Sequence, residues 1–154
     1  MELEDVFRAH QKAVFAYFLR VVGNRQDAEE LTQETFVRAC EAAIRFRGDS
    51  SVTTWLFGIA RRVLLEAARA GLFERRPAFP DRLVSDAGDP DERMDLERAL
   101  ASLGASDRET LVMVDVLGFT PTEAAAVAEV SPETFRVRLH RARARLREEY
   151  VGER

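Results

Sequence analysis

The chain is 154 residues long, is 46% hydrophobic and carries a formal net charge of −4 at pH 7. This length holds one ordinary domain or two small ones, and the hydrophobic share excludes a chain that is disordered throughout. No run of about 18 apolar residues is present and the N-terminus is acidic, so we expect a cytoplasmic protein with no membrane insertion and no secretory signal.

The sequence contains no recognisable catalytic or metal-binding motif. The single cysteine, Cys40, excludes an internal disulfide, and the two histidines, His10 and His140, lie too far apart to suggest a metal site. No phosphate-binding glycine loop or nucleophile motif occurs, so we expect no enzymatic activity, no cofactor and no metal. Cys40 follows Phe36 by one helical turn, and we expect it to be a small buried residue.

Two helices are predicted at the start of the chain. The first covers about residues 3–22 and ends at Gly23, which supplies a left-handed C-cap. The second covers about residues 27–44 and begins with a variant capping box. Its polar side carries Val37 among acidic residues, a pattern that fits either a chance surface residue or a docking face.

A basic third helix follows a loop at residues 46–51, which is rich in Gly, Asp and Ser. The helix is predicted from about residue 53 to residue 70. Trp55 lies on its apolar side, which favours a core residue over a base-stacking one. Three helices of this length suffice for a small bundle, so we assign residues 1–71 to one domain. The side chains that make this helix more basic than the preceding one are Arg61, Arg62 and Arg69.

Residues 72–91 contain three prolines and one glycine with few periodic apolar side chains, which indicates a flexible linker. The second domain, residues 92–154, is predicted to contain two helices followed by a helix-turn-helix. No strand pattern occurs in the sequence. The predicted fold is therefore all-α, with two small helical domains joined by a flexible linker and a helix-turn-helix in the C-terminal domain.

Residues 118–147 carry the helix-turn-helix pattern. Ser131 is a good N-cap for the second helix, and Pro132 fits its first position, where a missing N–H costs nothing. Apolar residues at 135, 139, 142 and 146 form a narrow stripe by which this helix would dock. The turn position that usually holds glycine is Glu129, so the turn must accommodate a side chain.

The second of these helices is strongly basic, because residues 136–147 contain six arginines and no acid. A solvated surface helix would show mixed signs, so the pattern favours DNA reading. The net charge of the chain does not oppose this hypothesis, since residues 132–154 alone carry seven basic and four acidic side chains. The face opposite the apolar stripe contains Glu133, Val137, His140 and Arg141, and the border of the stripe contains Arg136, Arg143 and Arg147.

Two parts of the sequence carry a family resemblance: residues 27–39 (DAEELTQETFVRA) with residues 46–60 (FRGDSSVTTWLFGIA), and residues 108–147. In this order, with a proline-rich segment between them, they resemble the extracytoplasmic-function group of bacterial sigma factors. The resemblance implies that the chain binds core RNA polymerase and promoter DNA. An anti-sigma protein that occludes these surfaces is a further implied partner.

The resemblance also implies roles for individual residues. Contacts with polymerase would come from Asp27, Glu30, Gln33, Glu34, Val37 and Arg38. Unpaired bases of the minus-ten element would meet Phe46, Ser50, Arg61, Arg62 and Arg69. The minus-thirty-five element would be read in the major groove by Glu133, Thr134, Arg136, Val137, His140 and Arg141, with phosphate contacts from Arg143 and Arg147.

Five positions differ from the family's pattern. Arg62 stands where asparagine is typical, Glu66 where aspartate is typical and Ala70 where the second arginine of a pair is usual. Gly104 stands where proline is usual, and Val137 where serine is frequent. Three functional hypotheses follow from the sequence. The first is a sigma factor that requires polymerase. The second is a polymerase-independent helix-turn-helix regulator, which would bind a palindromic site as a dimer. The third is a sigma-like protein that acts mainly through an anti-sigma partner.

Overall fold

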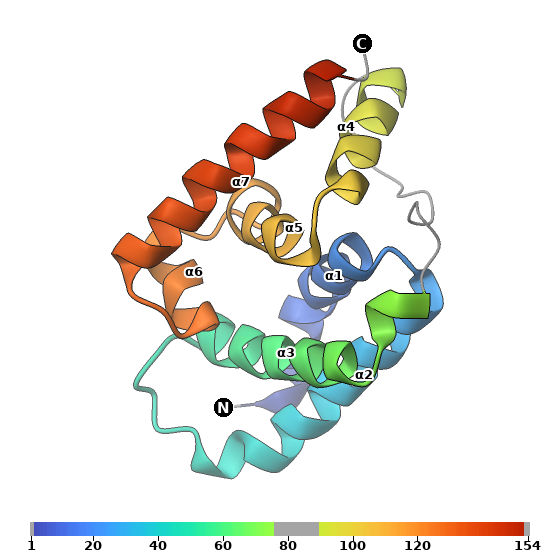
Figure 1. Ribbon diagram of the computed structural model, residues 1–154. Helices are drawn as coiled ribbons and strands as arrows, with labels where there is room; N and C mark the ends of the chain where they lie inside the picture. Colours follow the sequence, from blue (N-terminus) through green and yellow to red (C-terminus); the bar gives the residue numbers. More distant parts are fainter. Residues whose placement is uncertain (1, 76–89, 153–154) are drawn as a thin grey trace.

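The computed structural model describes residues 2–75 and 90–152, and every regular element in these two ranges is a helix (Figure 1). This confirms the all-α prediction. None of the helices in the described ranges is long and apolar enough to cross a membrane. The elements are α1 (Leu3–Val22), α2 (Arg25–Ala42), η1 (Ala43–Arg45), α3 (Val52–Arg69), η2 (Leu72–Arg75), α4 (Pro90–Ser102), α5 (Ala105–Leu111), the π-helical turn η3 (Val112–Val116), α6 (Pro121–Ala128) and α7 (Pro132–Gly152).

The first three helices pack on one another and form the N-terminal half. As predicted, α1 ends at Gly23, which has φ 79° and donates its N–H to the Leu19 carbonyl over 2.8 Å. The predicted start of α2 at Asp27 is wrong. The side-chain oxygen of Asn24 accepts the N–H of Asp27 over 2.9 Å, so Asn24 is the N-cap and α2 begins directly after it.

The prediction that Cys40 is buried is also wrong, because its side chain is exposed. The residue that faces the core is its neighbour Ala39, which is 2% exposed. Successive residues on a helix are rotated by about 100°, which carries Cys40 away from the core. Trp55 was predicted to be core and is half-buried against it, with its ring centroid 5.0 Å from that of Phe46.

The C-terminal half contains the predicted helix-turn-helix, formed by α6 and α7. Thr120 and Glu123 form a reciprocal capping box at the start of α6, and the backbone N–H of Thr120 lowers the pKa of the Glu123 carboxyl. The turn places Glu129 in the left-handed region at φ 58°. Ser131 then caps α7 by accepting the N–H of Thr134 over 3.1 Å. The start of each helix of the motif is thus fixed by a local side-chain bond.

The two halves pack against each other, with α3 on α6 and with α1 on α5 and η3 (Figure 1). Their buried side chains form one hydrophobic core cluster. Of the predicted linker, residues 76–89 lie outside the described residues. At its edges, Leu72–Arg75 is a 3-10 helix whose first residue is buried, and α4 already begins at Pro90.

Candidate nucleic-acid and polymerase interfaces

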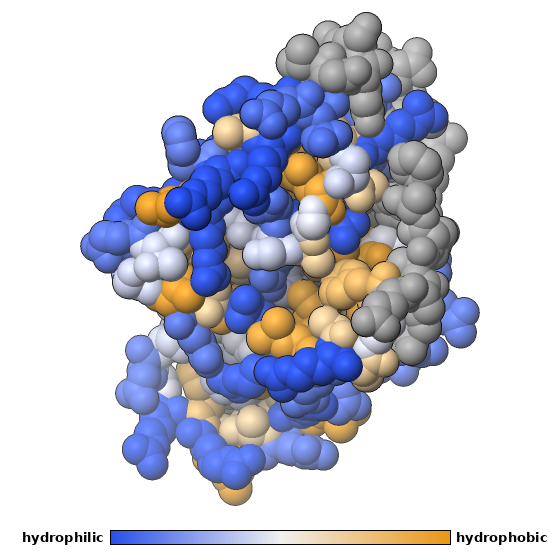
Figure 2. Space-filling model, viewed as in Figure 1, coloured by the Kyte–Doolittle hydropathy of each residue, from blue (hydrophilic) through white to orange (hydrophobic). Residues whose placement is uncertain are grey.

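Helix α7 docks by a narrow apolar stripe and leaves its opposite face in solvent. Phe135, Leu139 and Ala142 are 1%, 5% and 0% exposed, and Leu146 packs at the edge of the core. The ridge formed by α7 is covered mainly by hydrophilic side chains, with isolated hydrophobic atoms among them (Figure 2). All predicted reading and phosphate-contacting residues on this helix are exposed: Glu133, Thr134, Arg136, Val137, His140, Arg141, Arg143 and Arg147.

The exposed arginines of α7 are not equivalent. Arg143 makes a bidentate pair with Asp115 of η3, with nitrogen–oxygen distances of 2.6 and 3.2 Å. These bonds raise the pKa of the Arg143 guanidinium. Arg145 pairs with Asp107 of α5 over 2.8 Å. Both pairs fasten α7 to the rest of the C-terminal half, so a DNA phosphate has to compete with a carboxylate for either arginine.

The predicted minus-ten residues are distributed over two different surroundings. Ser50 and Arg69 are exposed and Phe46 is half-buried, on the loop and on α3 of the N-terminal half. Arg61 and Arg62 instead contact the C-terminal half. The Nε of Arg61 lies 3.1 Å from a carboxylate oxygen of Glu109 in α5, and Arg62 lies 3.6 Å from Glu129 in the turn before α7.

The exposed side of α2 presents the residues predicted to bind polymerase. Glu30, Gln33, Glu34 and Val37 are exposed, whereas Asp27 is half-buried beside the N-cap. Val37 is 52% exposed, as single apolar side chains on protein surfaces commonly are. A second exposed apolar residue, which the sequence pattern did not predict, lies just beyond this helix. Ile44 is 92% exposed on η1, where the helix tightens after Ala42 and no longer follows the period of α2.

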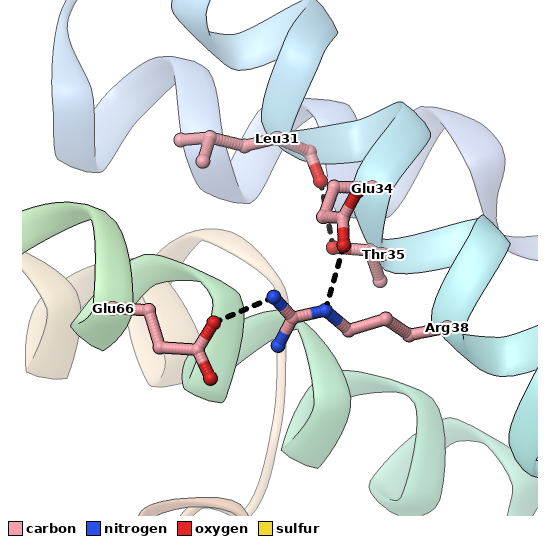
Figure 3. A network of polar contacts seen from close by, with 5 residues as sticks. All are labelled: Leu31, Glu34, Thr35, Arg38 and Glu66. Atoms are coloured by element: carbon pink, nitrogen blue, oxygen red, sulfur yellow. Dashed lines mark hydrogen bonds and ion pairs between the residues drawn. The ribbon is translucent and has the colours of Figure 1, made fainter.

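Arg38 joins α2 to α3 and is the centre of a polar network (Figure 3). Its Nε donates to Glu34 over 2.8 Å, and its terminal nitrogen donates to Glu66 of α3 over 2.5 Å. These bonds raise the pKa of the Arg38 guanidinium and lower the pKa of the Glu66 carboxyl. Glu66, one of the departures from the family's pattern, therefore orients a residue of the predicted polymerase-binding side.

A buried polar cluster that the sequence pattern did not predict lies between the halves. Tyr17 of α1 is fully buried and donates its hydroxyl to Glu109 over 2.5 Å, and the same carboxylate binds Arg61. Burial, and after it the charge of Glu109, raise the pKa of Tyr17 well above its usual range. These residues are separated by 48 and 92 positions along the chain, so no local pattern could have joined them.

Comparison with known proteins bears directly on these surfaces. The family model for sigma-70 region 2 matches residues 6–71, and the one for sigma-70, region 4 matches residues 93–146. The chain is 36% identical to the ECF RNA polymerase sigma factor SigC of Mycobacterium tuberculosis, over 92% of this chain and 79% of the relative. It is 32% identical to SigE of Mycolicibacterium smegmatis, over 94% of this chain but only 60% of the relative's length.

A solved structure extends the likeness to three dimensions. The sigma factor RpoE, in a co-crystal structure with the anti-sigma factor NepR from Bartonella quintana, matches with a TM-score of 0.80 at 26% identity, and the match covers 98% of both chains. The match therefore includes both halves, with α2, α3 and α7 among the shared elements. On the sequence and the fold together, the chain belongs to the extracytoplasmic-function (ECF) family of RNA polymerase sigma factors.

Proposed function

We propose that this protein binds core RNA polymerase and directs it to promoters by reading a minus-thirty-five element with α7. The observation that carries the proposal is the division of α7 into a buried stripe and an exposed basic face. Arg136 and Arg141 lie in the N-terminal half of the helix, the part that goes deepest into a major groove. Arginine pairs bidentately with guanine, and Val137 between them suits a thymine methyl.

The N-terminal half would supply the other two contacts of a sigma factor. The exposed side of α2, defined by Glu30, Gln33, Glu34, Val37 and Arg38, would dock on polymerase. The loop at residues 46–51 and the basic residues of α3 would hold unpaired bases of the minus-ten element, where cationic side chains offset the cost of unstacking. We propose residues 1–71 and 92–154 as the corresponding units, joined by residues 72–91.

An anti-sigma protein is the regulator that we propose for this chain, as NepR is the anti-sigma factor in the RpoE complex. Promoter-directed transcription also places the proposed function in the bacterial cytoplasm, where core polymerase and the chromosome are found. Binding as an initiation factor requires recognition surfaces and no catalytic group, which agrees with a non-enzymatic role for the family.

Transcription in vitro tests the function directly. Core polymerase is incubated with a library of promoter fragments, with and without the protein. We expect transcripts only when the protein is present, and we expect their templates to share two motifs separated by a fixed spacer. Binding to a palindromic duplex without polymerase, together with no transcription from any fragment, would contradict the proposal and favour an independent regulator.

The polymerase-binding side has its own test. Val37→Glu places a charge among acids on the exposed side of α2, and we expect weaker capture of core polymerase with an unchanged helical content. The matched control is Val116→Glu, which makes the same substitution at a residue of similar exposure (42% against 52% for Val37) in the C-terminal half. Equal capture of polymerase by both variants and the parent would mean that α2 is not the dock.

A further inference from the structure

Two of the six arginines between residues 136 and 147 of α7 are held by acids from other elements of the C-terminal half. Arg143 binds Asp115 of η3, and Arg145 binds Asp107 of α5, each through two nitrogen–oxygen contacts of 2.6 to 3.2 Å. The other four form no ion pair with any described residue: Arg136, Arg138, Arg141 and Arg147. The charge of α7 is thus divided into a paired and an unpaired part.

The two paired arginines lie on opposite borders of the apolar stripe of α7. Residues two positions apart on an α-helix are separated by about 200° around its axis, so Arg143 and Arg145 point to different sides. Asp115 therefore approaches α7 from one side and Asp107 from the other. The reading helix is flanked by one acid on each border.

The backbone that carries Asp115 is itself unusual. In the π-helical turn η3 the N–H of Leu117 donates to the carbonyl of Val112 over 2.8 Å, five positions back. Turns of this kind are rare and occur frequently at functional sites. Val112 and Met113 are buried, whereas Asp115 is exposed. The turn therefore presents Asp115 at the surface beside α7 from a buried base.

The borders of a reading helix are the parts that face phosphates. An α-helix with its side chains is about 10–12 Å wide, and the major groove is about 12 Å wide. A helix in the groove therefore fills it, with its outward face on the base edges and its borders beside the two backbones. Arg143 and Arg145 would reach phosphate from these borders, but their guanidinium groups are occupied. A carboxylate that a phosphate displaced would remain beside the backbone and repel it.

Phosphate contacts add affinity but carry no sequence information. Each arginine that neutralises a phosphate strengthens binding to every sequence, whereas Arg136, Val137 and Arg141 on the outward face can distinguish bases. An acid that prevents a phosphate contact therefore weakens binding to the whole chromosome. The base contacts then supply a larger share of the binding free energy.

We propose that Asp107 and Asp115 limit the sequence-independent DNA affinity of this chain by withholding Arg145 and Arg143 from the phosphate backbone. Both acids are positioning residues, which act through the arginines and do not contact DNA. The proposal rests on the proposed function in one respect, that α7 is the helix that enters the groove. If the pairs only fastened α7 to its half, their loss would lower stability and leave the salt dependence of DNA binding unchanged.

The test replaces both acids in an Asp107→Asn/Asp115→Asn variant of the full chain. Fluorescence anisotropy of labelled duplexes of random sequence measures binding between about 50 and 200 mM salt. Each released arginine should steepen the slope of log affinity against log salt by about 0.9, hence the double variant by about 1.8. Over this range of salt the variant should lose about tenfold more affinity than the parent. Adding Arg143→Ala/Arg145→Ala should return the slope to about that of the parent.

Glu29→Gln/Glu41→Gln is the matched control, because it makes the same change in net charge at two exposed acids of α2 in the N-terminal half. Its slope should change clearly less than that of the double Asn variant. Circular dichroism reports whether each variant keeps its helical content. If the double Asn variant does not, the two single variants replace it, each with an expected change of about 0.9 in slope.

A slope of the Asn variant no steeper than that of the control would overturn the proposal. A steeper slope that Arg143→Ala/Arg145→Ala does not reverse would overturn it as well, and so would the absence of measurable binding by the Asn variant at about 50 mM salt. The measurement uses neither polymerase nor promoter. Failure of the proposed function, which is seen as the absence of directed transcription, is therefore observed separately.

Discussion

The basic residues of α7 and those of α3 were both expected to contact DNA, yet they lie in different surroundings. On α7 the exposed face carries Arg136 and Arg141 in solvent, opposite a stripe that is almost fully buried. On α3, Arg61 pairs with Glu109 and is mostly buried, and Arg62 pairs with Glu129. Arg136 and Arg141 of α7 are thus available to a ligand, whereas Arg61 and Arg62 of α3 are paired with acids of the other half.

Which side chains of a helix are exposed depends on its own sequence, whereas their pairing with acids depends on the neighbouring helices. The exposure of α7 follows from its own period, because four apolar residues on one side fix which arginines point outward. The state of the α3 arginines follows from acids that are distant in sequence. A face that is basic by sequence is therefore a binding surface only if no other part of the chain supplies its counter-ions.

The largest expected effect concerns the docking of α7. Phe135 is 1% exposed, and Phe135→Ala should lower the free energy of unfolding by about 3–5 kcal/mol, because a large buried ring is replaced by a cavity. Urea denaturation followed by circular dichroism measures this loss. Val137 is 48% exposed on the same helix, and Val137→Ala should change the free energy of unfolding by no more than about 0.5 kcal/mol. Equal losses would mean that the helix docks by a different face.

Base reading should give the next largest effect. Arg141→Ala should cost about 1–3 kcal/mol on the preferred minus-thirty-five site and relax selectivity at one or two base pairs. Val137→Ser should change the preferred sequence with little change in non-specific affinity, since it removes an apolar contact with a thymine methyl. Selection from a randomised element by the holoenzyme measures both. If the parent and these variants select identical sequences, α7 does not read bases.

The buried hydrogen bond between Tyr17 and Glu109 can be tested by measuring stability as a function of pH. The pKa of Tyr17 is raised in the folded protein, so the unfolded chain loses the phenolic proton first, near pH 10. The associated stability is complete below that pH and falls above it, by up to about 1.4 kcal/mol per pH unit. Tyr17→Phe should flatten the fall. Parallel pH profiles for the parent and Tyr17→Phe would show that this phenol does not titrate differently in the two states.

Much of the fold could be predicted because its signals are local. Gly23 ends α1, Thr120 and Glu123 cap α6, and Ser131 caps α7, each through bonds to residues within four positions. The start of α2 was missed by two residues, because the capping pattern at Asp27 resembled that of its true cap, Asn24. A cap signal identifies a helix end reliably but fixes its position less well.

The sequence predicted which side of each helix is exposed, but not which charged residues pair with one another. Helical period placed Val37 and the α7 residues outside, as the structure has them. Period could not show that Arg38 binds Glu66 or that Arg61 binds Glu109, because those pairs depend on how helices pack. The halves meet through residues up to 92 positions apart, and contacts at that separation produce no pattern in a single sequence.

The smallest expected effect is on the salt dependence of DNA binding, and it compares two arginines within α7. Arg147 is exposed, whereas Arg143 is held by both oxygens of Asp115. A phosphate contact by a solvated arginine releases about one counterion, so Arg147→Ala should weaken binding to all sequences alike and lower the salt slope by about one unit. Arg143 already shares its charge with a carboxylate, so Arg143→Ala should lower the slope by clearly less than one unit. Fluorescence anisotropy of duplex DNA over a salt series measures both slopes. A larger change for Arg143→Ala would show that DNA displaces Asp115, and pairing within the chain would then no longer predict which arginines are available.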